Sequence, residues 1–185
     1  MTSLHKGTIM IDEVQEILFD DQAITEKVRE IAARISADYA GKELVLICIL
    51  KGAAVFTADL MRSLTVPITV QFVQAASYGA STTASKIITV ENDSTIDISG
   101  KHVLLVDTII DTGETMAHLF DTFAGRGPVS LRAVALLDKR SRRTANISVK
   151  YCGFEIPDKF VVGYGMDYEE KHRNLPYIAV IKTKQ

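Results

Sequence analysis

The chain has 185 residues, 21 of them basic and 23 acidic, so its formal net charge is −2. Hydrophobic residues make up 47% and charged residues 24%, which is ordinary for a globular domain and excludes extensive disorder. The near-neutral charge argues against a general nucleic-acid or anionic-membrane binder, because such proteins carry a basic excess. We expect a single domain that spans residues 1–185.

The two cysteines and the N-terminal segment indicate a reducing compartment. Cys48 and Cys152 are too few for a disulfide framework, and each lies in an apolar, strand-like run, so we expect buried, reduced thiols. The N-terminal segment lacks the apolar core of a signal peptide. The longest uninterrupted apolar run, residues 44–50, is far shorter than the ~20 residues of a membrane span. These features predict a cytoplasmic protein.

Helical and strand-like patterns alternate in the first third of the chain. Apolar residues at helical spacing predict a helix over residues 25–39, with Thr25 as its N-cap and Gly41 just beyond its end. The continuous aliphatic run over residues 43–50 predicts a strand that is buried on both faces, as in parallel sheets. A second helix is expected over residues 53–64.

The remainder of the chain continues this alternation. Residues 77–85 are small and polar and predict a mobile loop, and residues 113–124 have helical spacing. Further strands are expected at residues 68–74, 86–91, 102–106, 131–137 and 178–181. Strands that alternate with helices predict an α/β fold with a mainly parallel twisted sheet flanked by helices.

The strand over residues 102–106 ends at a segment suited to phosphate binding. Asp107 and Asp111 are followed by residues 112–115, Thr-Gly-Glu-Thr, which open a helix. Backbone N–H groups at a helix N-terminus hold phosphate, and carboxylates beside it accept hydrogen bonds from sugar hydroxyls. Alternatively, Asp111 or Thr112 simply caps the helix. The sequence contains neither a P-loop pattern nor a strand followed by GxGxxG.

Residues 103–115, VLLVDTIIDTGET, resemble the phosphoribosyl pyrophosphate (PRPP) signature of type I phosphoribosyltransferases. Other segments resemble the 6-oxopurine, or hypoxanthine-guanine, branch of that family. They are Leu50-Lys51-Gly52 (pyrophosphate loop), Ser77-Tyr78-Gly79 (lid), and Leu137-Asp138-Lys139-Arg140 with residues 154–167 (purine pocket). The resemblance runs from about Ile17 to Ile181 and implies that family's fold, with a small hood built from the terminal segments.

The resemblance also implies which residues hold PRPP. Asp111 would be the catalytic residue that manages the proton at N7 of the purine. A cis peptide would join Leu50 and Lys51. The residues expected to bind PRPP or the nucleotide are Lys51, Gly52, Asp107, Thr108, Ile109, Ile110, Thr112, Gly113, Glu114, Thr115 and Arg173.

The resemblance also implies which residues bind the purine, which hold the metal and which form the lid. Lys139 would donate to O6 of the purine and Phe160 would stack on its ring; the alternatives are a surface charge cluster and a plain core strand. Mg²⁺ would be held by Asp167 and Asp107. The residues expected at the purine are Lys139, Lys159, Phe160, Val161 and Asp167, and those of the lid that excludes water are Ser77, Tyr78 and Gly79.

The chain departs from the family pattern at one position. The family has Glu-Asp where this chain has Asp107-Thr108, and those two acids hold the ribose hydroxyls. Thr108 keeps a hydroxyl but lacks the charge that strengthens such a hydrogen bond. On this basis, Thr108→Asp should leave PRPP affinity about equal and raise kcat, because the ribose would be better oriented in the transition state.

The function implied is transfer of the 5-phosphoribosyl group from PRPP to hypoxanthine or guanine, giving IMP or GMP and pyrophosphate. The implied partners are these small molecules, with neither nucleic acid nor membrane, and the implied assembly is a homo-oligomer, dimer or tetramer. One alternative is a PRPP- or nucleotide-sensing regulator with the same fold, which the loss of an acid at Thr108 favours. Another is a phosphoribosyltransferase that prefers xanthine; adenine is disfavoured because Lys139 would face a second donor.

Overall fold

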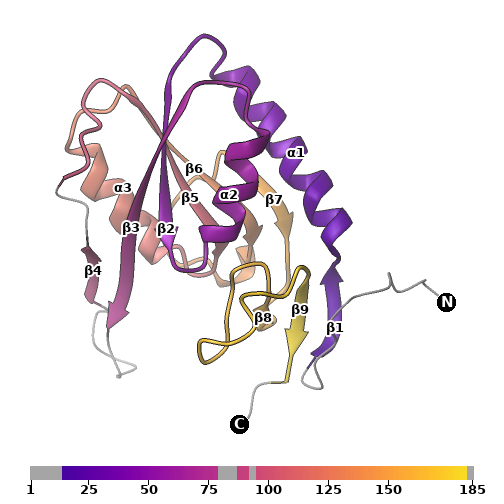
Figure 1. The fold of residues 1–185 in the computed structure, drawn as a ribbon. Helices are drawn as coiled ribbons and strands as arrows, with labels where there is room; N and C mark the ends of the chain where they lie inside the picture. The colour runs from indigo at the N-terminus through magenta and orange to yellow at the C-terminus, as the bar shows by residue number, and fades with distance from the viewer. Residues whose placement is uncertain (1–13, 79–86, 92–94, 183–185) are drawn as a thin grey trace.

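The computed structural model describes residues 14–78, 87–91 and 95–182, and it contains a six-stranded sheet, a three-stranded sheet and flanking helices (Figure 1). The elements are β1 Val14–Phe19, α1 Asp21–Asp38, β2 Leu44–Leu50, α2 Ala54–Ser63, β3 Ile68–Tyr78, β4 Ile87–Glu91, β5 His102–Ile110, α3 Glu114–Ala124, β6 Ser130–Asp138, a short 3₁₀ helix η1 Arg140–Arg142, β7 Tyr151–Glu155, β8 Val161–Val162 and β9 Ile178–Ile181. Among the described residues, no helix is long and apolar enough to span a membrane.

The larger sheet has the strand order β4-β3-β2-β5-β6-β7. Its strands are parallel except β4, which pairs antiparallel with β3. Helices α1 and α2 cover one face and α3 the other (Figure 1). The α/β fold with a mainly parallel sheet is therefore as predicted.

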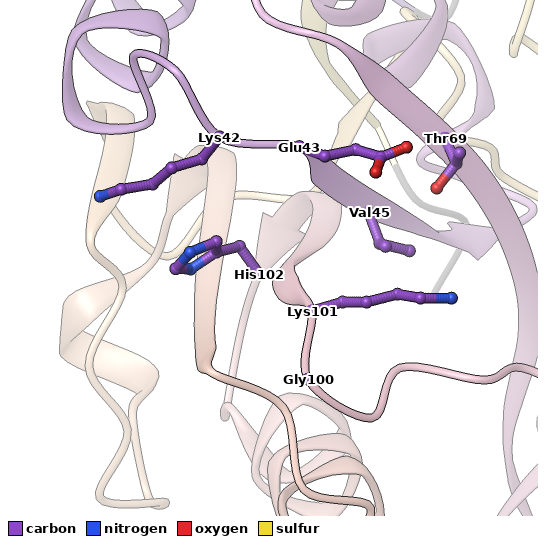
Figure 2. A pocket seen from close by; sticks show the side chains of 7 residues that line it. All are labelled: Lys42, Glu43, Val45, Thr69, Gly100, Lys101 and His102. Carbon is purple, nitrogen blue, oxygen red and sulfur yellow. The ribbon is translucent and has the colours of Figure 1, made fainter.

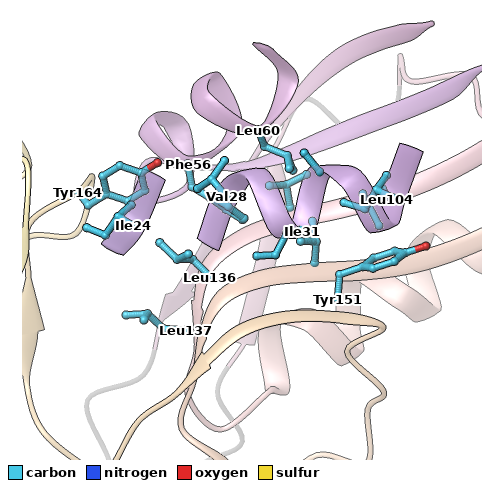
Figure 3. Packing of buried hydrophobic residues seen from close by; sticks show 14 of the residues in the cluster. Ile24, Val28, Ile31, Phe56, Leu60, Leu104, Leu136, Leu137, Tyr151 and Tyr164 are labelled. Atoms are coloured by element: carbon cyan, nitrogen blue, oxygen red, sulfur yellow. The ribbon is translucent and has the colours of Figure 1, made fainter. Parts of the chain in front are cut away.

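Both faces of β2, a central strand of the larger sheet, are buried, which explains its uninterrupted aliphatic sequence. Leu44 and Leu46 pack in the cluster formed with α1 and α2, whereas Val45, Ile47 and Ile49 pack in the cluster with α3. In Figure 3, the apolar side chains of α1 and α2 meet those of the central strands. Successive side chains of a strand point to opposite faces, so one strand serves both cores.

Helix α1 and strand β5 have boundaries that differ from those predicted. Helix α1 begins one turn earlier, because the Asp20 carboxylate accepts a hydrogen bond from the Ala23 N–H at 2.8 Å; Asp20, and not Thr25, is the N-cap. Strand β5 does not end at Val106 but continues to Ile110, since its pairing with β6 continues there.

The loop predicted to begin at residue 77 begins later, because strand β3 continues to Tyr78. Strand β3 includes Ser77 and Tyr78, whose backbones pair with Ile88 and Ile87 of β4. Gly79 and the rest of that segment lie outside the described residues. Of the two cysteines, Cys48 is buried and Cys152 is half-buried; both are free thiols, as predicted, and burial raises the pKa of each.

The smaller sheet, which we call the hood, has the antiparallel order β1-β9-β8. It joins residues 14–19 to residues 178–181, so it is built from the two terminal segments, as the family resemblance implied. Figure 1 shows the hood beyond one end of the larger sheet. Contacts from Gly52 to Gly165 and from Lys51 to Glu170 identify that end as the carboxyl edge of β2.

Candidate active site

Most of the candidate residues gather where β2, β5 and β6 end and the hood begins. Lys51 and Gly52 follow β2, Asp111 follows β5, and Lys139 follows β6. In parallel sheets ligands bind beyond the carboxyl ends of the strands, so this edge is the expected site.

The segment between β5 and α3 is shaped for an anion. Gly113 precedes α3 with φ +85°, a left-handed conformation that favours glycine, and Glu114 N–H donates to Thr112 Oγ1 at 3.4 Å. The Asp111 carboxylate does not cap the helix, because it accepts a hydrogen bond from Arg142. Apart from the Glu114 N–H, which makes this long contact, the N–H groups of the first turn of α3 have no acceptor within the helix, and such groups suit a phosphate.

A second segment supports this phosphate loop from behind. The Thr112 carbonyl accepts hydrogen bonds from the N–H groups of Thr144 and Ala145 at 3.0 and 3.1 Å. A Cβ atom on Gly113 would lie 2.7 Å from Cδ of Arg143, too close for any other residue without a shift. Thr144 Oγ1 also donates to Glu114 at 3.3 Å. The loop's conformation is therefore fixed by packing as well as by its own sequence.

Three charged side chains, those of Arg142, Lys139 and Asp158, lie around the predicted catalytic carboxylate of Asp111. Arg142 Nε donates to Asp111 at 2.8 Å, and the same guanidinium lies 3.3 Å from Asp158. Lys139 is only 7% exposed, and its Nζ lies 3.7 Å from Asp111 and 3.8 Å from Asp158. Both distances exceed a normal hydrogen bond, so the buried ammonium keeps donors for a ligand. The surface-cluster alternative for Lys139 is wrong, because Lys139 is buried.

The predicted purine-stacking residue is exposed although it is aromatic. Phe160 is 45% exposed and its ring meets that of Tyr168 edge-on, with centroids 5.5 Å apart. Val161 is buried in β8, paired with Val180 of β9. Lys159 donates instead to Glu16 of β1 at 2.6 Å, which turns its ammonium toward the hood.

The predicted pyrophosphate residues form a second charged cluster. The peptide between Leu50 and Lys51 is cis, as the resemblance implied. Lys51 Nζ donates to Glu170 at 3.1 Å, and the same carboxylate oxygen lies 3.4 Å from Arg173. Arg173 also contacts Asp167 Oδ1 at 2.8 Å and donates to the Gly165 carbonyl at 2.8 Å. The two cations expected at the pyrophosphate thus share one internal anion.

Asp107 and Thr108 occupy different environments although they are adjacent. Asp107 is partly buried, and desolvation raises its pKa to about 7 against the opposing hydrogen bonds from the N–H groups of Thr108 and Ile109. Thr108 is completely buried, and its Oγ1 donates to the Gly52 carbonyl at 3.0 Å. Ile110 is buried, and its carbonyl accepts from the Lys139 N–H at 2.9 Å.

The donor set suits a magnesium ion that is shared with a substrate. Within the described residues, no three His, Cys, Asp or Glu side chains come together as a metal-binding group. Mg²⁺ is commonly bound by one or two carboxylates, with phosphate oxygens and water completing its octahedron. Asp167 offers a partly exposed carboxylate beside the cation cluster, which fits such a site.

Some residues at this edge are not among those expected individually from the sequence. Arg142 and Glu170 contact predicted site residues, and Asp158 and Gly165 were expected only as part of the segment 154–167. Arg142 lies in a basic run directly after β6, which is a usable signal. Glu170 gives no such signal, because only folding brings it to Lys51, 119 positions away.

A separate hollow of about 360 Å³ lies at the opposite edge of the sheet (Figure 2). Its lining residues are Lys42, Glu43, Val45, Thr69, Gly100, Lys101 and His102. They lie at or before the first residues of β2, β3 and β5, so this hollow is remote from the carboxyl ends. It contains none of the candidate residues.

An α/β fold with a glycine-containing loop before a helix and a cation cluster at the carboxyl edge of its sheet is typical of proteins that bind sugar phosphates or nucleotides. A family model described as "Phosphoribosyl transferase domain" matches residues 14–169. The chain therefore belongs to the phosphoribosyltransferase family.

Individual relatives and solved structures show which members of this family the chain is similar to. The chain is 42% identical over 173 residues to the hypoxanthine-guanine phosphoribosyltransferase of Streptococcus pneumoniae, covering 94% of this chain and 96% of that one. It is 38% identical to the Bacillus subtilis enzyme of the same name, covering 94% and 97%. A hypoxanthine phosphoribosyltransferase structure from Staphylococcus aureus, 38% identical, matches with a TM-score of 0.90 over 96% of this chain and 97% of its own. The fold implied by the resemblance is thereby confirmed.

Proposed function

We propose that this enzyme transfers the 5-phosphoribosyl group from PRPP to hypoxanthine or guanine, giving IMP or GMP and pyrophosphate. The observation that carries the proposal is the buried Lys139 ammonium held beside the Asp111 carboxylate. A purine with an oxo group at C6 needs a donor, and a ring nitrogen that becomes a nucleophile must lose a proton. The two side chains supply these two functions at one place.

In this proposal the other candidate residues orient PRPP. The N–H groups of residues 112–115 hold the 5′-phosphate at the start of α3, and Lys51 and Arg173 receive the pyrophosphate. The purine nitrogen bonds to C1′ as the bond from C1′ to the pyrophosphate oxygen breaks, and Asp111 accepts the displaced ring proton. Asp167, with Asp107, would hold Mg²⁺, which neutralises charge on the pyrophosphate when bound.

Phe160 completes the purine site in this proposal. Its exposed ring offers a face on which the purine stacks, and Val161 offers backbone groups to the edge of the base. Ser77, Tyr78 and Gly79 would close over C1′ and exclude water, which would otherwise hydrolyse the reacting centre.

Pyrophosphate release from PRPP and Mg²⁺ tests the proposal with hypoxanthine, guanine, xanthine and adenine offered separately. We expect turnover with hypoxanthine or guanine, little with adenine, and none with EDTA present. Preference for xanthine would identify the related activity instead. If PRPP binds in calorimetry but no purine is converted, the protein is a PRPP sensor. Sedimentation equilibrium in the same buffer tests the proposed dimer or tetramer.

A further inference from the structure

We propose that Thr108 is a positioning residue for the pyrophosphate loop and does not bind the ribose. Its hydroxyl holds the Gly52 carbonyl and so fixes the conformation in which Lys51 and Gly52 receive the pyrophosphate of PRPP. This inference rests on the proposed function.

The burial pattern of β5 separates Thr108 from the open edge of the sheet. Asp107 and Ile109 are partly exposed, whereas Thr108 and Ile110 are buried, with Thr108 at 0% exposure. Successive side chains of a strand point to opposite faces. The Thr108 hydroxyl therefore does not share a face with Asp107, and it donates a hydrogen bond to the Gly52 carbonyl at 3.0 Å.

Gly52 is held from two further directions. A Cβ atom on Gly165 of the hood would lie 2.3 Å from the Gly52 carbonyl oxygen, so the hood backbone packs directly on this carbonyl. The Lys51 carbonyl accepts a hydrogen bond from the Ala54 N–H at 3.2 Å. A Cβ on Gly52 itself would meet nothing within 4 Å, so the described contacts of this residue are made by its backbone.

The chemistry of this contact requires a donor. A threonine hydroxyl has a proton to give to a carbonyl oxygen, whereas an ionised carboxylate has none and would face the carbonyl with like partial charge. An ionised aspartate at this fully buried position would also be destabilised by the loss of its hydration. On this inference Thr108→Asp should weaken PRPP binding and lower kcat, whereas a ribose-binding role for this position predicts equal PRPP affinity and a higher kcat.

Thr108→Val removes the hydroxyl with little change in shape, and Thr108→Ser restores it. We expect Thr108→Val to weaken binding of both PRPP and pyrophosphate by about 5- to 30-fold, because the Gly52 carbonyl loses its donor. Thr108→Ser should stay within about threefold of the parent. The KM for the purine should not change, and calorimetry with Mg²⁺ present measures the two affinities.

Ribose 5-phosphate separates this role from ribose binding, because it lacks the pyrophosphate. Its affinity should be equal in the parent and in Thr108→Val; an equal loss for ribose 5-phosphate and PRPP would assign Thr108 to the ribose and overturn the inference. Unchanged pyrophosphate affinity in Thr108→Val would also overturn it. Should Thr108→Val fail to fold, Thr108→Ala provides the same comparison, and amide exchange at Ala53 and Ala54 should be faster in it. Pyrophosphate binding is measured without turnover. A failure of this inference can therefore be distinguished from a failure of the proposed reaction.

Discussion

Asp111 and Asp158 contact the same two cations, Lys139 and Arg142, but only Asp111 precedes the phosphate loop. This arrangement provides a matched pair of variants. Asp111→Asn removes a proton acceptor and keeps its shape, so we expect kcat to fall by ~10²–10³ with little change in substrate affinity. Asp158→Asn removes the same charge from the same cluster and should change kcat less than about fivefold.

Steady-state kinetics of the two variants distinguish a catalytic role from a general effect of charge. Similar losses in both would mean that the cluster merely orients Lys139. An Asp111→Asn variant within threefold of the parent would leave Asp111 without a role in proton transfer.

The raised pKa of Asp107 predicts a pH dependence of stability. Because burial raises this pKa to about 7, the folded protein keeps a proton that the unfolded chain releases near pH 4. The free energy of unfolding should therefore fall as pH rises from about 4 to 7. Asp107→Asn removes this titration, so its stability relative to the parent should increase across that interval, as measured by urea unfolding in EDTA.

Asp97→Asn is the control, because the pKa of Asp97 is shifted in the opposite direction to that of Asp107. The Ser99 N–H and Lys101 hold the pKa of the exposed Asp97 below its usual value, so its stabilising effect is present at neutral pH and is lost as pH falls below about 4. Parallel curves of unfolding free energy against pH for the parent and Asp107→Asn would contradict the assignment.

At the scale of elements, the hood loop meets the β2 loop at Gly165. Gly165 has φ +96°, and an added Cβ would lie 2.3 Å from the Gly52 carbonyl oxygen. Gly165→Ala should therefore cost more than the ~1–2 kcal/mol of left-handed strain alone, and PRPP affinity should fall with it. Gly100→Ala is the matched control, because Gly100 has φ +70° with nothing within 4 Å. Thermal unfolding compares them; equal losses of stability would contradict the close contact.

The ion pairs of Glu170 predict a gain of affinity on mutation. Its carboxylate contacts Lys51 and Arg173, both proposed to receive pyrophosphate. Glu170→Gln should tighten pyrophosphate binding by about two- to fivefold, since an exposed ion pair of this kind is worth less than ~1 kcal/mol. Glu169→Gln changes the net charge equally and is the control. Equal effects in calorimetry would reduce the gain to a general charge effect.

Local sequence was sufficient for elements whose signal is local. The alternating cores of β2 and the helical spacing of α1 predicted both elements within a turn. The end of β5 was misplaced because Asp107 and Thr108 look like the start of a loop, whereas pairing with β6 keeps them in the strand. Strand β8 has two residues and is held by β9, so it has no pattern of its own to detect.

At the scale of the whole molecule, the site depends on contacts between distant parts of the chain. The phosphate loop could be predicted because its residues are consecutive. The hydrogen bond from Thr108 to Gly52 spans 56 positions, and that from Lys51 to Glu170 spans 119. Composition and periodicity contain no information about such pairs, so the roles of Thr108 and Glu170 required the tertiary structure.

The pairing of β1 with β9 has a consequence for the order in which the protein matures. During synthesis β1 leaves the ribosome before the strands of the larger sheet, but its partner at residues 178–181 is translated only after every strand of that sheet. Until then β1 is an unpaired edge, which is the kind of segment that invites wrong pairing with other chains. Strand β8, which follows Phe160, also lacks its partner until β9 has been synthesised. All strands of the larger sheet are thus synthesised before the hood can form, and the hood forms only when β9 pairs with β1 and β8.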